Sequence, residues 1–219
     1  MASLLSSSIR RLSKQASALL PALTLTVSLQ ASPAVTITSP VDGAVFHPGQ
    51  TMIVTVDATP LAFKTVGVAG KLPLGFSKIL YAPPYRFLMK IPPNIDPGPY
   101  TLIAVGVLHS GEAVHSPWVR VAIERPDSPL RIESDLHTLI LDYIGESIHL
   151  VVEGTFADGS KISLTRSTFT KYESDTPDVV TVDAHGIAVA ISPGSAKIKI
   201  TNRSATTVIP VTVASGRRR

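Results

Sequence analysis

The sequence contains no cysteine, and this single absence excludes several kinds of chemistry. Disulfide bonds, iron–sulfur clusters, thiolate zinc sites and thiol nucleophiles all depend on that residue. The absence does not contradict export from the cell, because a sandwich domain of ordinary size can be stabilised by core packing alone.

Aromatic and charged residues are also scarce, at 5% and 16% of the chain. After the first thirty residues, no stretch has the apolar spacing of an amphipathic helix. None reaches the roughly 18 apolar residues of a membrane-spanning helix. What the chain does have is 44% hydrophobic residues, rich in Val and Ile, with 18 prolines between them. This composition predicts an all-β fold.

The formal charge of +4 lies at the two ends of the chain. Without the first 34 residues, 17 basic and 16 acidic residues remain. Without the terminal triplet 217–219 as well, 14 basic and 16 acidic residues give a body of charge −2. No basic stripe interleaved with aromatic residues remains, so we expect no nucleic-acid partner. We expect the basic tail, 215–219, to be solvated.

The first 34 residues have the features of a signal peptide. Arg10, Arg11 and Lys14 form a basic region, an apolar region follows over 16–29, and small residues over 32–34 suit cleavage. The apolar region is too short to span a membrane, so we expect cleavage and no integral span in the mature chain. The competing interpretation is an organellar transit peptide, since the segment is rich in Ser and contains no acid.

Residues 179–200 carry the clearest pattern of strands and turns. A β-rich run over 179–182 is followed by turn residues over 183–186, and Pro193-Gly194 forms a second turn. Positive φ angles are predicted for Gly186 and Gly194. The strand between the turns is predicted to face the core through Ile187, Val189 and Ile191, and the strand after them through Ile198 and Ile200.

The order of residues in this segment resembles the second half of a group 2 bacterial immunoglobulin-like domain, the module of surface adhesins such as intimin and invasin. The resemblance implies a β-sandwich that serves as a spacer or a binder. Tyr172 stands where the family often has Trp, with Phe169 nearby. The residues that carry the resemblance are Tyr172, Ser174, Asp175, Pro177, Val179, Val182, Asp183, Gly186, Pro193, Gly194, Ala196 and Ile198.

Two tandem immunoglobulin-like sandwiches fit the length, at roughly 90 residues each. We predict domains at 35–124 and 130–214, joined by a stiff linker, 125–129, that contains two prolines. In the first domain, Tyr100 resembles the tyrosine corner, in which the hydroxyl bonds to upstream backbone. Its predicted core-facing residues include Met52, Val54 and Val56.

Carboxylates surround the predicted linker. Acids gathered between sandwich domains can bind calcium through oxygen ligands, whereas solvated charges at a boundary are the ordinary alternative. The candidate calcium ligands are Glu124, Asp127, Glu133 and Asp135. No other cofactor is expected.

The segment from Gly70 to Pro84 is unusually apolar for a loop. One interpretation is a surface for a partner or a sugar, because aromatic side chains offer large contact area at small entropic cost. The other is an edge strand and a loop folded over the open end of the core. The candidate ligand-binding residues are Phe76, Tyr81 and Tyr85.

No catalytic motif stands out, and we expect no enzymatic activity. His109 and His115 come closest to a metal pair, but a two-residue turn at Ser110-Gly111 predicts that they lie on opposite faces. The leading hypothesis is a secreted, periplasmic or cell-surface protein that acts in adhesion or protein–protein interaction. Its partner would be an envelope or host-surface protein or polysaccharide. The alternatives are a carbohydrate-binding module and a structural spacer without a specific ligand.

Overall fold

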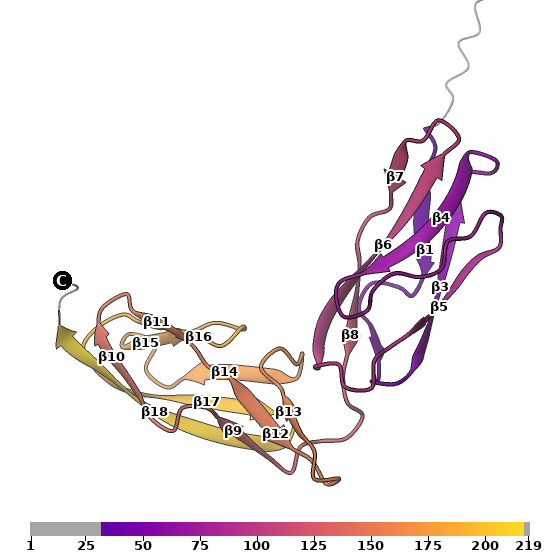
Figure 1. Ribbon diagram of the computed structural model, residues 1–219. Coiled ribbons are helices and arrows are strands. Elements are labelled where there is room, and N and C mark those ends of the chain that lie inside the picture. Colours follow the sequence, from indigo (N-terminus) through magenta and orange to yellow (C-terminus); the bar gives the residue numbers. More distant parts are fainter. Residues whose placement is uncertain (1–31, 217–219) are drawn as a thin grey trace, which may run out of the picture. The chain divides into compact units, whose positions relative to one another are not determined.

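The computed structural model describes residues 32–216, and every regular element in that range is a β-strand (Figure 1). The predicted signal peptide and the last three arginines lie outside the described residues, apart from 32–34 at the predicted cleavage site. Within 32–216, no helix is long and apolar enough to cross a membrane.

The first sandwich is formed by eight strands. A three-stranded sheet has the order β1-β3-β5, and the second sheet has the order β2-β8-β6-β4 with β7 paired to β6. Neighbouring strands are antiparallel except for β2 and β8, which run parallel. The strands are β1 (Val35–Ser39), β2 (Ala44–Phe46), β3 (Thr51–Ala58), β4 (Phe63–Gly70), β5 (Tyr85–Lys90), β6 (Gly98–Leu108), β7 (Ala113–His115) and β8 (Val119–Ile123).

The core of the first sandwich confirms the predicted alternation. Met52 and Val54 are fully buried and Val56 nearly so, while the residues between them face outward or lie half-buried. The tyrosine corner is also confirmed, because the Tyr100 hydroxyl donates to the carbonyl of Asp96 at 2.7 Å. This hydrogen bond satisfies the polar end of an otherwise buried ring.

The turn between β6 and β7 differs from its prediction by one residue. A two-residue turn at Ser110-Gly111 predicts that Gly106 pairs with His115. In the structure Val105 pairs with His115, and Leu108 donates its N–H to the carbonyl of Glu112. The turn therefore holds three residues, 109–111, and Gly111 has a φ of +92°. A three-residue hairpin with glycine at the left-handed position is a common alternative to the two-residue turn.

The second sandwich is formed by ten strands in three short sheets. Their orders are β10-β18-β17-β14, β11-β16-β15 and β13-β12-β9, and only β10 and β18 pair in parallel. The strands are β9 (Arg131–Ser134), β10 (Leu139–Tyr143), β11 (Ser147–His149), β12 (Val152–Thr155), β13 (Lys161–Ser163), β14 (Thr170–Ser174), β15 (Val180–Val182), β16 (Ile187–Ala190), β17 (Gly194–Asn202) and β18 (Ala205–Gly216).

Two predicted features of this core are confirmed. Ile198 and Ile200 on β17 are fully buried, whereas Lys197 and Lys199 are exposed. Gly186 has a φ of +79°, and a Cβ there would lie 2.9 Å from the ring of the buried Tyr172. Glycine is thus required at position 186 by both backbone conformation and space.

The predicted face of β16 is wrong. Ala188 and Ala190 are buried, whereas Ile187 and Ile191 are 40% and 44% exposed. The strand pairing explains why the alanine face of β16 is the buried one, because Ala188 lies between Ile148 on β11 and Val182 on β15. Small residues opposite larger ones fill the interior without overpacking.

Candidate functional site

The candidate ligand-binding aromatics lie on the first sandwich, and two of the three are strongly exposed. Phe76 is 88% exposed and Tyr81 is 72% exposed. Tyr85, at the start of β5, is half-buried and packs against the core of the first sandwich. Phe76 and Tyr81 are therefore available to a partner, and Tyr85 has a structural role as well.

The segment that carries Phe76 covers the free edge of β4. Val66 and Leu80 exchange two backbone hydrogen bonds at 2.9 Å, and Ser77 donates its N–H to the carbonyl of Val68 at 2.8 Å. This pairing leaves less unpaired backbone at the edge of the sheet. Of the predicted apolar loop, Leu74 is buried in the core and Leu80 packs against it.

A shallow hollow of about 310 Å³ lies over β4 and β6 beside this segment. Phe76 and Ile79 form one side of it, and Val105 and Val107 on β6 contribute to the rest. Tyr85 lines a different hollow, with Leu61 and 83–84. Phe76 and Tyr85 thus line separate hollows, and Tyr81 belongs to the lining of neither.

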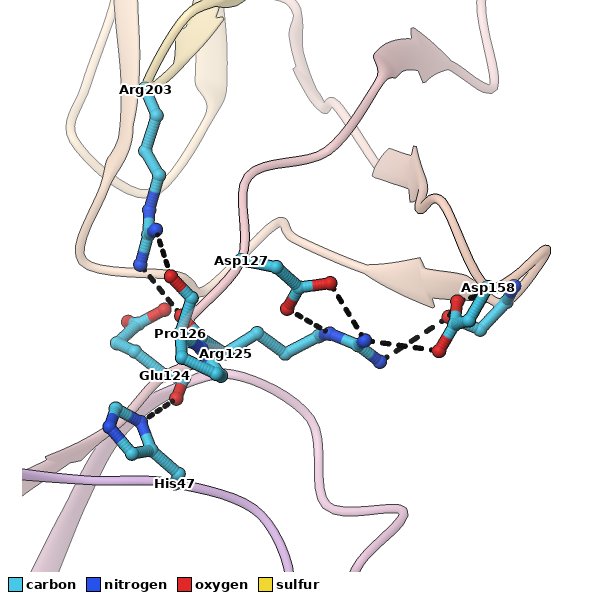
Figure 2. Close-up of polar contacts among 8 residues, drawn as sticks. His47, Glu124, Arg125, Pro126, Asp127, Asp158 and Arg203 are labelled. Carbon is cyan, nitrogen blue, oxygen red and sulfur yellow. Dashed lines mark hydrogen bonds and ion pairs between the residues drawn. The ribbon is translucent and has the colours of Figure 1, made fainter.

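The strongest polar constellation lies at the join between the sandwiches, here defined as residues 124–127 with the side chains that bind them. Figure 2 shows the contacts made by His47, Asp158 and Arg203. Glu124, directly after β8, is only 2% exposed. One carboxylate oxygen accepts from the Ser167 hydroxyl at 2.8 Å. The other accepts from the N–H and hydroxyl of Thr168 at 2.6 and 2.9 Å. Three donors compensate for the burial of this charge.

The backbone of the join is held from both sides. The His47 Nδ1 of the first sandwich donates to the Glu124 carbonyl at 2.7 Å. The Arg203 guanidinium of the second sandwich donates to the carbonyls of Arg125 and Pro126 at 2.6 and 2.7 Å, and it lies 4.3 Å from the Phe169 ring centroid. A linker whose carbonyls are occupied in this way has few free conformations.

Arg125 holds the join onto the start of the second sandwich (Figure 2). Its guanidinium forms a two-pronged ion pair with Asp127 at 2.8 and 2.9 Å, contacts Asp158 at 3.1 Å, and stacks 4.3 Å from the Phe156 ring centroid. The hydrogen bond from Arg125 lowers the pKa of Asp127. Hydrogen bonds from Ser160, then the one from Arg125, lower the pKa of Asp158 to about 2. Both carboxylates therefore stay charged well into the acid range.

The four predicted calcium ligands do not converge. Glu124 and Asp127 have the partners described above. Glu133 pairs with Arg131 at 3.3 Å, and Asp135 accepts from the Val151 N–H at 3.1 Å. In the part of the chain that the structure describes, no three His, Asp or Glu residues are placed to hold a metal ion. The structure places the four carboxylates in separate contacts, each with donors from the protein.

Sequence reasoning missed Ser167, Thr168 and Arg203. They lie 43 to 78 residues from the join residues that they bind, so no local spacing pointed to them. Arg203 has one local signal, a positive φ of 52° in the turn between β17 and β18. A non-glycine residue in that conformation often has a special role.

Comparison with known proteins agrees with the fold. Residues 168–215 match the family described as "Bacterial Ig-like domain". No curated protein sequence matches the chain.

Among solved structures, the fibronectin(III)-like modules of Clostridium thermocellum CbhA are 26% identical over 41% of this chain and 94% of theirs, with a TM-score of 0.35. The D00-D0 domain of intimin is 8% identical over 83% of this chain and all of its own, with a TM-score of 0.31.

A β-glucuronidase from Parabacteroides merdae is 13% identical over 84% of this chain, with a TM-score of 0.37, and the chain spans only 24% of that enzyme. All three TM-scores are low. The all-β structure and the family match agree, and residues 168–215 of the second sandwich are similar to a bacterial immunoglobulin-like domain.

Proposed function

We propose that this protein is a non-catalytic connector of the bacterial envelope, in which a fixed join presents the first sandwich to a partner on a cell surface. The activity would be adhesion or protein–protein interaction. The chain would be exported and would act in the periplasm, at the cell surface or outside the cell.

The observation that carries this proposal is the buried Glu124 with its three donors. A flexible tether between independent domains has no reason to bury a charge, because burial costs several kcal/mol unless the partners are in place. A connector that must keep its modules from swivelling gains from such a contact. The hydrogen bonds that the side chains of His47, Arg125 and Arg203 form at the join support the same role.

The contact surface in this proposal is the exposed apolar segment of the first sandwich. Phe76, Ile79 and Tyr81 are 88%, 58% and 72% exposed. Phe76 and Ile79 line the shallow hollow over β4 and β6. Exposed apolar side chains of this kind are typical of protein contact sites, where aromatic anchors contribute most of the affinity.

The test is binding of the labelled full chain to intact bacterial and epithelial cells, measured by flow cytometry. We expect the double variant Phe76→Ser/Tyr81→Ser to lose most of the binding. The matched control is Leu61→Ser, which removes a side chain that is 96% exposed elsewhere on the same sandwich. Equal binding by both variants would contradict the proposed contact surface. Absence of wild-type binding to every cell tested would favour a spacer without a ligand.

A further inference from the structure

A second hollow, of about 690 Å³, lies beside the join and is lined by residues of both sandwiches. Its lining includes three residues that are cationic at neutral pH, Lys71, Arg120 and Arg166, together with His149 and His185. No carboxylate belongs to the lining. The folded body carries two more acids than bases, so this gathering of one sign of charge departs from the rest of the molecule.

The three cations are not committed to carboxylates. Among residues 32–216, the ion pairs involve other side chains, and Lys71, Arg120 and Arg166 are exposed. Arg166 donates one hydrogen bond to the Pro99 carbonyl at 2.9 Å and lies 5.4 Å from the ring centroid of Tyr100. These contacts hold its guanidinium in place and leave its charge unneutralised.

Two carboxylates near the hollow are already occupied by backbone donors. Asp42 accepts from the N–H of Arg120 at 2.7 Å. Asp183 accepts from the N–H groups of His185 and Ile187, both at 2.8 Å. These hydrogen bonds fix both side chains outside the lining of the hollow, and the cations remain the charges that face a ligand.

The lining and the volume of the hollow favour one class of anionic ligand. A long polyphosphate such as nucleic acid would meet the net negative body beyond the hollow, and the lining offers no exposed aromatic ring on which bases could stack. The volume suits a small ligand, and Pro99, Ala184 and Ile187 supply apolar wall against which a sugar ring can pack.

We propose that this hollow binds an acidic oligosaccharide, whose carboxylate groups are held by Lys71, Arg120 and Arg166. The inference rests on the proposed function, because the hollow exists only while the join keeps the two sandwiches together. It adds a ligand class at a place distinct from the apolar segment around Phe76.

The first experiment titrates trigalacturonate into the full chain by isothermal calorimetry, with the methyl-esterified trisaccharide as the neutral match. We expect saturable binding of the acid and about tenfold weaker binding of the ester, since about 1.4 kcal/mol of charge-assisted contact corresponds to that factor. The affinity for the acid should fall as salt is added. Equal affinity for acid and ester would overturn the proposal.

The second experiment repeats the titration with Lys71→Glu/Arg120→Glu. The control is Arg86→Glu/Lys90→Glu, which makes the same charge change at exposed positions of β5. We expect a loss of about tenfold or more in the first variant and a change within about twofold in the control. Equal losses would mean non-specific attraction. A single-stranded oligonucleotide that competes for the same cations with higher affinity would overturn the assignment to a sugar.

Failure of this inference can be told from failure of the proposed function. If NMR shows that the two sandwiches of the wild-type chain reorient together and trigalacturonate still does not bind, only the inference fails. If they reorient independently, the proposed fixed join is wrong, and the proposed binding in the hollow is wrong with it.

Discussion

The two sandwiches bury different kinds of residues. The first buries almost only hydrophobic side chains; within the described residues its buried polar residues are Ser116 and, at its end, Glu124. The second buries a connected polar group in which Asn202 donates to the hydroxyls of Ser167 and Thr170 at 3.2 and 2.8 Å. Its buried polar residues are Ser134, Thr165, Ser167, Thr170 and Asn202.

This difference explains how the join is made. Ser167 accepts from Asn202 and donates to Glu124, so the polar group of the second sandwich continues into the linker. The first sandwich contributes the glutamate and keeps its apolar surface exposed. Its exposed aromatics include Phe76 and Trp118, whereas Phe169 of the second sandwich is covered on one face by Arg203. The second sandwich thus supplies the polar contacts that anchor the linker, and the first presents exposed aromatic side chains to a partner.

The largest expected effect comes from truncating one core at a time. Ile200→Ala in the second sandwich and Leu102→Ala in the first should each lower the free energy of unfolding by about 3 to 4 kcal/mol, because both side chains are fully buried. Urea unfolding followed by amide NMR should show the loss in the mutated sandwich first. The exposed Ile187→Ala is the matched control and should cost under about 1 kcal/mol. Equal loss in both sandwiches from either core variant would contradict two separate cores.

Glu124→Ala should have the next largest effect. It leaves the Ser167 and Thr168 donors buried without their acceptor, and we expect a cost of about 3 kcal/mol in urea unfolding. Asp127→Ala removes a carboxylate of the same join that is 41% exposed, so it should cost under about 1 kcal/mol. Similar costs for the two variants would show that the buried glutamate has no special role.

Gly186→Ala should destabilise the second sandwich by about 2 kcal/mol. The new methyl group would meet the Tyr172 ring, and the φ of +79° is strained for alanine. Gly111→Ala on the first sandwich has a similar φ of +92° with open space around it, so it should cost only about 1 kcal/mol. Thermal unfolding of the two variants measures the difference, and equal losses would mean that the Tyr172 contact does not matter.

The smallest effect is a difference in alkaline stability between two tyrosines. Burial raises the pKa of Tyr172 to about 12, and burial also raises the pKa of Tyr100, where Arg166 opposes the shift. The folded state holds the proton more tightly than the unfolded state, so stability is full below pH 10 and falls as pH rises towards about 12. Tyr172→Phe should remove more of this alkaline loss than Tyr100→Phe. Phenolate absorbance and urea unfolding against pH give the measurement, and a larger effect of Tyr100→Phe would contradict it.

The sequence predicts the fold well where a pattern is local. The alternation on β3 and β17, the tyrosine corner at Tyr100 and the positive φ of Gly186 depend on neighbouring residues, and all are confirmed. The face of β16 could not be predicted in the same way. Its short run alternates β-branched residues with alanine, and the larger residues on β11 and β15 decide which set fits inside.

The candidate site was predicted less well, for a physical reason. The sequence offers Glu124 only as a candidate calcium ligand beside the linker, whereas its contacts in the structure are with Ser167 and Thr168, which only the folded chain brings to it. The exposure of Phe76 and Tyr81 agrees with the predicted contact surface, whereas Tyr85 packs against the core. Spacing along the chain can identify candidate residues of a given type. Which of these residues contact one another depends on long-range contacts in the folded chain.

The most direct test of the central claim is a measurement of residual dipolar couplings for the backbone amides of both sandwiches in the full chain. A fixed join predicts that one alignment tensor fits both sets of couplings in the wild type, and that two different tensors are needed in Glu124→Ala. Two different tensors in the wild type would contradict the claim that the buried glutamate and its partners hold the sandwiches together.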